Sequence, residues 1–306
     1  MLAVATGIGL ASLDPGCGRL DFRERGATDG AIGGTVDAMT DAPPDALGTC
    51  NPSLPFGTPV AIAELNDPSH NDGTLRLMPD ELSGYFWTFR GSSSAQIYLA
   101  TRPDFATPFA ITPVQGLGLS GSALDPTISS DGSLLVLRRN SPGDDLYEAQ
   151  RISPDTFGSA TAITSIDTGS TEVQPFLQLG GDQLYFSSSR TNGGDIYRST
   201  VTGTTFGAPT VVSELATATD EGDPVISPDG LTIYFRSNRP ATPGGYNIFV
   251  ATRPTATGTF GSAQLVPNVN SDADDGPSWL SPDGCRLYIS SARAGTNDIY
   301  VSTRGG

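Results

Sequence analysis

From about residue 51 to its end, the chain carries short runs of mixed apolar and polar residues between Gly- and Pro-rich segments. Runs such as Leu184–Arg190, Ile233–Arg239 and Leu287–Arg293 are rich in Tyr, Phe, Ile and Ser, a composition typical of β-strands. An Asp-Gly pair precedes the last two runs. Asp-Gly favours the tight turn of an antiparallel hairpin, because both central positions of that turn need positive φ. The pattern therefore predicts an all-β fold.

The same pattern of runs recurs five times. One run of each repeat begins with Ile or Leu followed by an aromatic residue, and successive copies are 49, 50, 52 and 51 residues apart: Ile97, Leu146, Ile196, Ile248 and Ile299. Another run opens on a Phe, in the copies Phe56, Phe109, Phe157, Phe206 and Phe260. A four-stranded antiparallel sheet cannot bury both faces alone, whereas five sheets packed around an axis can. We therefore expect a five-bladed β-propeller of four-stranded antiparallel blades over residues 51–306.

The order of the runs predicts how the ring closes. The run that ends each repeat has its first copy at 56–63, before every other strand, and the last repeat stops at Val301–Arg304 without such a run. The N-terminal strand should therefore complete the C-terminal blade by pairing with the strand that starts at Ile299, which removes two open sheet edges.

Several of these motifs resemble the repeats of TolB-like β-propellers. The residues that carry the resemblance are Ser227–Gly230, Tyr234–Phe235, Ser237–Arg239 and Gly244–Phe249, with their counterparts in the fifth repeat. The resemblance spans about five-sixths of the chain. Members of this family are bacterial envelope proteins that typically bind other proteins, so the resemblance implies an exported protein with a protein or peptide partner. Because propellers host many functions, it is more specific for fold than for function.

The residues before the repeats predict export. Met1–Leu13 is an uncharged apolar run of signal-peptide length, and Cys17 follows it directly after a Gly, as at a bacterial lipidation site. We interpret 1–17 as a signal or lipoprotein leader. The segment 18–50 is rich in Asp, Ala and Gly and predicts a disordered spacer. The expected location is the periplasm, or the outer membrane or cell surface as a lipoprotein.

The chain contains three cysteines. If Cys17 is lipidated, Cys50 and Cys285 remain, and an oxidising compartment favours a disulfide between them. Cys285 begins the second strand of the fifth repeat, and Cys50 lies six residues before Phe56, which enters the same blade. The bridge would lock the ring; two independent thiols are the alternative.

The composition argues against nucleic-acid partners, metal centres and cofactors. Seventeen Arg against 33 Asp plus Glu give a formal charge of −16, a field that repels nucleic acid. The single His, His70, has neither metal-ligand spacing nor a nucleophile motif beside it, and no phosphate-binding loop occurs. We expect no metal centre and no cofactor. Structural calcium at Asp272–Asp275 or Asp220–Asp223 is the one alternative, because both segments are rich in carboxylates.

Candidate binding residues come from the acidic loops and from the departures from the repeat. Recurring Arg side chains are expected to pair between blades with the acids ahead of each first strand: Arg190, Arg239 and Arg293 with Asp125, Glu172, Asp223 and Asp275. Alternatively, carboxylates form a ring at one mouth of the channel. Trp87 lies in the first repeat, which departs from the others because it lacks the Asp-Gly turn. Trp279 is either a channel residue or a core residue. The candidate binding residues are Trp87, Trp279, Asp223 and Asp274.

The sequence thus favours a non-enzymatic, monomeric cell-envelope propeller that binds a protein or peptide and meets the membrane only through a lipid anchor. The alternative is a glycan-binding or glycoside-hydrolase-like propeller that uses acids at the channel mouth. Carboxylates held by arginine would favour the first interpretation. An open three-carboxylate funnel would favour the second.

Overall fold

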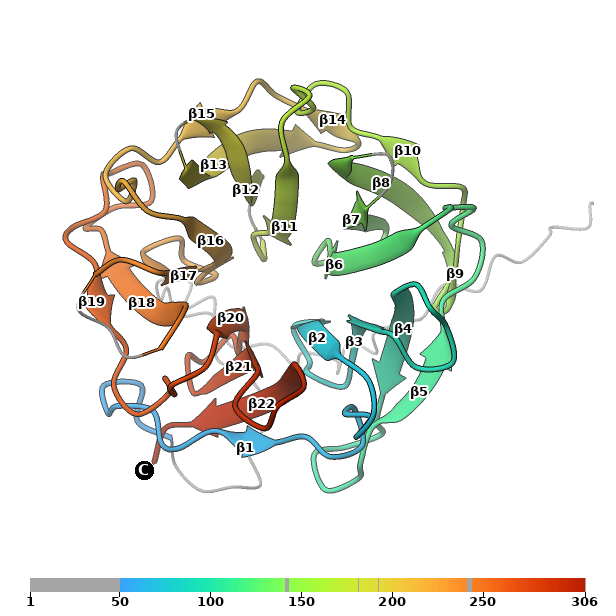
Figure 1. Cartoon of the computed structure of the whole chain (residues 1–306), viewed down its shortest axis with the longest axis horizontal. Helices are drawn as coiled ribbons and strands as arrows, with labels where there is room; N and C mark the ends of the chain where they lie inside the picture. The colour runs from blue at the N-terminus through green and yellow to red at the C-terminus, as the bar shows by residue number, and fades with distance from the viewer. Residues whose placement is uncertain (1–49, 141–142, 181, 192, 241–243, 306) are drawn as a thin grey trace, which may run out of the picture. The chain divides into compact units, whose positions relative to one another are not determined.

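A computed structural model describes residues 50–140, 143–180, 182–191, 193–240 and 244–305. The predicted leader, the lipidation site Cys17 and the spacer up to residue 49 lie outside the described residues. Within the described part of the chain, five small antiparallel sheets form a ring, as Figure 1 shows, and there is no helix. The predicted five-bladed β-propeller is confirmed. None of the described residues forms a helix long and apolar enough to cross a membrane.

Each blade runs from the channel outwards in four strands. The innermost strands, which surround the centre in Figure 1, are β2 (Asp72–Leu77), β6 (Ser122–Ile128), β11 (Glu172–Leu177), β16 (Glu221–Ile226) and β20 (Asp275–Leu280). The second strands are β3 (Ser83–Thr88), β7 (Leu134–Asn140), β12 (Gln183–Thr191), β17 (Thr232–Ser237) and β21 (Arg286–Ser291). The third are β4 (Gln96–Thr101), β8 (Asp144–Ser153), β13 (Gly193–Thr202), β18 (Asn247–Thr252) and β22 (Asp298–Thr303).

The outer strands are short and exposed, which matches their position at the rim. They are β5 (Ala110–Pro113), β10 (Thr161–Ala162), β15 (Thr210–Val211), β19 (Gln264–Leu265) and β1 (Val60–Ala61). Blades 2 and 3 each add a two-residue strand, β9 (Thr156–Phe157) and β14 (Thr205–Phe206), paired with β8 and β13. The inner strands are almost entirely buried, so the hydrophobic core lies between neighbouring blades.

The N-terminal strand closes the ring as predicted. β1 lies beside β22 in Figure 1, with Val60 opposite Val301. The Ile62 N–H also donates to the Ile299 carbonyl at 3.0 Å. Blade 5 is therefore built from both ends of the propeller sequence, and neither β1 nor β22 is left as an open edge on that side.

Recurrent aromatic and arginine side chains explain why the repeats keep these residues. A guanidinium lies over the Phe that opens the outer run in three blades: Arg102 on Phe109 at 4.3 Å, Arg253 on Phe260 at 4.4 Å and Arg304 on Phe56 at 4.1 Å. These contacts combine cation–π attraction with burial of the ring. The hydroxyl groups of second-strand tyrosines reach across to the next blade: Tyr85 to the Pro154 carbonyl, Tyr185 to Arg253, Tyr234 to Arg304 and Tyr288 to Glu81.

Cys50 and Cys285 form a disulfide, with their Cα atoms 6.2 Å apart. The few residues between Cys50 and Phe56 bring the chain back to the start of β21, where Cys285 is 3% exposed. The bridge joins positions 235 residues apart and therefore fixes the entering chain to blade 5.

Candidate functional site: the mouth of the central channel

The inner strands share a β-bulge that turns one side chain towards the channel. In four blades the residue at this place is not Gly and yet has positive φ: Thr74 at 48°, Asp125 at 49°, Gln174 at 57° and Asp223 at 47°. The pairing register shifts at each of these points. A left-handed conformation is costly for such residues, above all for β-branched Thr, and strained residues of this kind cluster at functional sites. All four line one cavity.

This central cavity has a volume of about 220 Å³. It brings together three of the predicted residues, Trp87, Asp223 and Asp274, with Arg138 and Arg236. A second cavity of about 250 Å³ lies between blades 3 and 4 and shares the lining residues Gln174 and Arg236 with the first. The central cavity is the candidate site.

The fourth predicted residue, Trp279, lies elsewhere. Its side chain is 2% exposed and packs edge-on against Tyr288, with ring centroids 5.8 Å apart. In the register of its blade it lies opposite Tyr288, as Arg76 lies opposite Tyr85 in blade 1. Trp279 is thus a core residue in the layer below the mouth, and we leave it out of the candidate site.

Asp125 belongs to a fixed chain of polar contacts. Its Oδ2 lies 3.0 Å from Arg138 Nε, and its Oδ1 accepts the Thr74 hydroxyl at 3.1 Å. The indole Nε1 of Trp87 donates in turn to Thr74 Oγ1 at 3.1 Å. The network holds the Trp87 ring and the Asp125 carboxylate in one orientation, a pre-organised arrangement.

Asp223 occupies the same place in blade 4 and pairs with Arg236, with Oδ2 3.2 Å from Nε. Burial raises the pKa of Asp223, with a further upward contribution from Asp125; Arg236 opposes the shift. Beneath the pair, Arg76 is 1% exposed, and its guanidinium lies 4.7 Å from the centre of the Phe176 ring. Burial lowers the pKa of Arg76 to about 10, although Asp223 and Asp125 favour its charged form.

A second set of acids, at the first residue of the inner strands and therefore ahead of the bulge, has a structural role. Each is buried at the start of an inner strand and pairs with an Arg 18 residues later: Asp72 with Arg90 at 2.9 Å, Glu172 with Arg190 at 3.1 Å, Glu221 with Arg239 at 3.3 Å, and Asp275 with Arg293 at 2.6 Å. The expectation of pairing between blades was wrong, because each acid lies at the start of an inner strand and its Arg lies at or just after the end of the second strand of the same blade. Asp125 and Asp223 form a separate, inner set.

Asp220 and Asp274 hold neighbouring blades together. Asp220 Oδ1 accepts the Gly194 N–H, and Asp274 Oδ1 accepts the Tyr246 N–H, both at 2.9 Å. The Tyr246 hydroxyl also donates to Asp220 Oδ2 at 2.9 Å. Each carboxylate thus binds a backbone N–H at the start of a third strand, or just before it, in the preceding blade. Asp274 nevertheless stays exposed at the rim of the central cavity.

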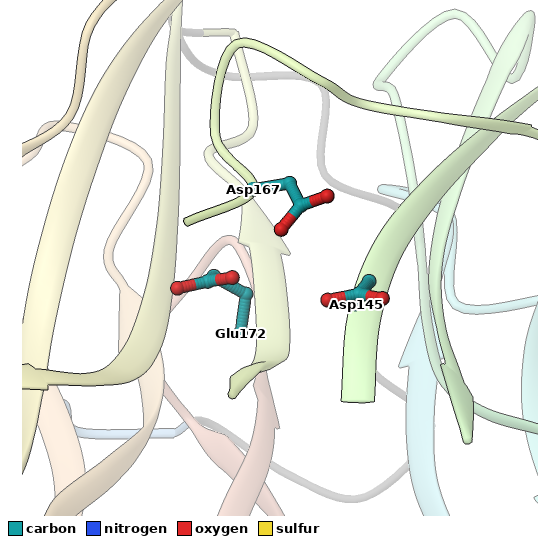
Figure 2. A group of neighbouring side chains, drawn as sticks. All are labelled: Asp145, Asp167 and Glu172. Atoms are coloured by element: carbon teal, nitrogen blue, oxygen red, sulfur yellow. The ribbon is translucent and has the colours of Figure 1, made fainter. Parts of the chain in front are cut away.

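Among the described residues, one group of acids has the closeness that a cation site needs. Asp145 at the start of β8, Asp167 in the loop before β11 and Glu172 bring carboxylate oxygens within 4.8 Å of one another between blades 2 and 3 (Figure 2). Glu172 already accepts hydrogen bonds from Ser188 and Arg190. The structural calcium considered at Asp220–Asp223 and Asp272–Asp275 stays a prediction.

The crowding of these acids predicts a pH effect. Burial raises the pKa of Asp145, and Asp167 and Glu172 add to the shift. The folded carboxyl of Asp145 binds its proton more tightly than the unfolded one. Raising the pH from the unfolded pKa of Asp145 through its higher folded pKa therefore lowers the free energy of unfolding. Asp145→Asn should therefore raise Tm at pH 7, and the gain should disappear below the ordinary Asp pKa of 3.8.

Calorimetry over a series of pH values checks this, with Asp182→Asn as a control at an exposed acid. A gain that is equal at all pH values would show that the carboxyl charge is not its cause.

The described residues form a five-bladed β-propeller with a polar cavity at the mouth of its channel, and this fold is similar to that of solved structures. No protein-family model and no curated protein sequence matches the chain. Among solved structures it is similar to TolB from Acinetobacter baumannii, with 16% identity and a TM-score of 0.50 over 79% of this chain and 57% of that one. It is also similar to the α-L-arabinofuranosidase PaAbf62A from Podospora anserina, solved in complex with cellotriose, with 11% identity and a TM-score of 0.50 over 84% and 98%.

These similarities establish the fold alone. The chain spans little more than half of the TolB structure. One neighbour is a TolB protein and the other a glycosidase, so the choice between binding and hydrolysis has to come from the residues at the mouth.

Proposed function

We propose that this chain is a non-enzymatic propeller of the cell envelope that binds a partner at the mouth of its channel. The sequence predicts a protein or a peptide as that partner. One observation carries the proposal: each carboxylate that lines the central cavity already has a partner within the fold, either an Arg, as for Asp125, Asp223 and Asp275, or a backbone N–H, as for Asp274.

Glycoside hydrolysis needs a different arrangement. One carboxyl must give a proton to the leaving group while a second attacks or activates water, and both must be free to face the bond that breaks. Here the Nε atoms of Arg138 and Arg236 lie against Asp125 and Asp223. This arrangement favours a site that recognises a ligand over one that cleaves it.

The envelope location has two supports. The Cys50–Cys285 disulfide is typical of proteins that fold in an oxidising compartment. The apolar run before Cys17 has the length of a signal-peptide core. We propose lipidation of Cys17 as the anchor, in keeping with the TolB-like repeats.

A second candidate function, glycoside hydrolysis, is favoured by one feature. The pKa of Asp223 is raised by burial, as a general acid requires, and the residue lies in the cavity with a second carboxylate nearby. This candidate makes Asp223 a proton donor and Asp125 its partner.

One experiment separates the two functions. Under the binding proposal, purified protein shows no turnover across a panel of glycosidase, esterase and peptidase substrates, assayed between pH 4 and 8, a range chosen to include protonated Asp223. Turnover that Asp223→Asn abolishes and Asp182→Asn retains would establish hydrolysis instead.

A further inference from the structure

Three of the four carboxylates that line the cavity are each paired with a guanidinium, and the fourth, Asp274, accepts a backbone N–H, so these contacts restrict the ligand. Asp125 faces Arg138, Asp223 faces Arg236, and Asp275 at the edge of the cavity faces Arg293. A ligand group with a net charge would meet attraction and repulsion from the two members of each pair. A neutral group that both donates and accepts hydrogen bonds can satisfy the carboxylate and the guanidinium together.

The cavity also offers one aromatic surface. Trp87 is half-buried and lines the cavity, while Phe89 packs against it edge-on at 5.9 Å and Thr74 holds its Nε1. The indole is therefore fixed in place with part of its surface exposed to the cavity. Such a surface suits a ring that has an apolar face and a polar edge.

Two glycines let these side chains pack closely against the backbone of neighbouring strands. A Cβ on Gly276, which lines the cavity, would lie 2.6 Å from Asp223 Oδ2, and a Cβ on Gly73 would lie 2.6 Å from Trp87 Cζ2. Neither glycine has a positive φ that would by itself require Gly. Close packing against the two ligand-facing side chains is the physical reason for Gly at both positions.

We infer that the central cavity binds one ring of a neutral saccharide against Trp87, with its hydroxyl groups shared between the Asp125–Arg138 and Asp223–Arg236 pairs. A saccharide ring combines a neutral charge, several hydroxyl groups on its edge and an apolar face, and it fits the paired charges better than an ionised peptide side chain. This inference rests on the proposed binding function at the channel mouth, and it assigns a saccharide to that site in place of the protein or peptide that the sequence predicts.

Fluorescence gives a direct test, because the chain has two Trp residues and Trp279 is buried away from the cavity. Full-length protein is titrated with cellotriose, glucose, xylose, arabinose and N-acetylglucosamine. At least one of these saccharides should change the Trp87 emission saturably.

Calorimetry then compares the affinity of variants for that saccharide. Trp87→Ala should weaken the affinity about tenfold, as loss of an aromatic contact does. Gly276→Ala should weaken it by a similar factor.

Gly261→Ala is the matched control, because its added Cβ would meet only the Thr252 carbonyl at an ordinary 3.5 Å, and it should bind like wild type. Unchanged melting curves show that each variant is folded. The same titration with a pool of random hexapeptides covers the peptide alternative.

The outcomes separate this inference from the proposed function. Saccharide binding that depends on Trp87 and Gly276 supports the inference. A response to hexapeptides with none to the five saccharides would overturn it and leave the binding function intact. Saccharide binding followed by cleavage, seen as new products in chromatography, would support the ligand class and overturn the non-enzymatic function. Saccharide binding that Trp87→Ala and Gly276→Ala both retain would place the site elsewhere and refute the inference.

Discussion

Glu81→Ala is expected to lower the free energy of unfolding by about 3 kcal/mol, as loss of one partner of a buried ion pair does. Glu81 is 3% exposed, and its carboxylate accepts hydrogen bonds from Arg286, from Nε at 2.8 and 3.1 Å and from Nη2 at 2.6 Å. The Tyr288 hydroxyl also donates to this carboxylate, at 3.0 Å. Because Glu81 belongs to blade 1 and both partners to blade 5, the substitution weakens the junction at which the ring closes.

The backbone at Glu81 supplies an internal control. Its φ is +56°, and it occupies the turn position that Gly230 fills in blade 4 with a φ of +71°. Glu81→Gly removes the same carboxylate but relieves the left-handed backbone, so it should be more stable than Glu81→Ala by about 1 kcal/mol. Urea unfolding of both variants measures the difference. If both variants unfold like wild type, the Glu81–Arg286 pair does not hold the junction.

Glu81 also shows where sequence interpretation stops. The first repeat visibly lacks the Asp-Gly turn, but nothing local predicts that Glu would adopt the conformation of Gly in order to reach an Arg 205 residues away. By contrast, the strands, the five blades and the closing strand were predictable, because the strand-opening residues recur at a spacing of about fifty residues in every copy.

The site was predictable only in part, for a similar reason. Asp223 and Asp274 were found because acids crowd those loops, and Trp87 because the first repeat departs from the others. The division of the acids into two sets was missed, because it depends on a β-bulge between Gly222 and Val225 that turns Asp223 inwards while Glu221 stays with Arg239. The residue types at Thr74 and Gln174 do not signal positive φ, and the one recurrent mark of the bulge is the Pro that follows Asp125, Gln174 and Asp223.

Arg138 and Arg236 were missed as well, although they decide the chemistry of the mouth. They lie on β7 and β17, whereas the recurrent Ser-x-Arg motif pointed to other arginines. Their register could have found them, because each lies opposite the residue that precedes Asp125 or Asp223 on the inner strand.

Loss of the Cys50–Cys285 disulfide should lower the free energy of unfolding by more than Glu81→Ala does. A bridge that closes a loop of 235 residues restricts the unfolded chain strongly, and the chain-entropy estimate is about 5 kcal/mol. Cys50→Ser is the suitable variant, because Cys50 is half-buried while Cys285 is 3% exposed and its thiol can stay in the core. We expect urea unfolding of exported Cys50→Ser to show this loss, with the propeller still closed by the β1–β22 pairing.

Reductant provides the control for this prediction. It should lower the stability of wild-type protein to that of Cys50→Ser and leave the variant unchanged, because the variant has no bridge between these positions to reduce. Equal stability of oxidised wild type and Cys50→Ser would contradict the prediction. In that case the β1–β22 pairing and the Arg304–Phe56 contact would be sufficient to hold the entering chain on blade 5, and the disulfide would add only to the order of the residues before Phe56.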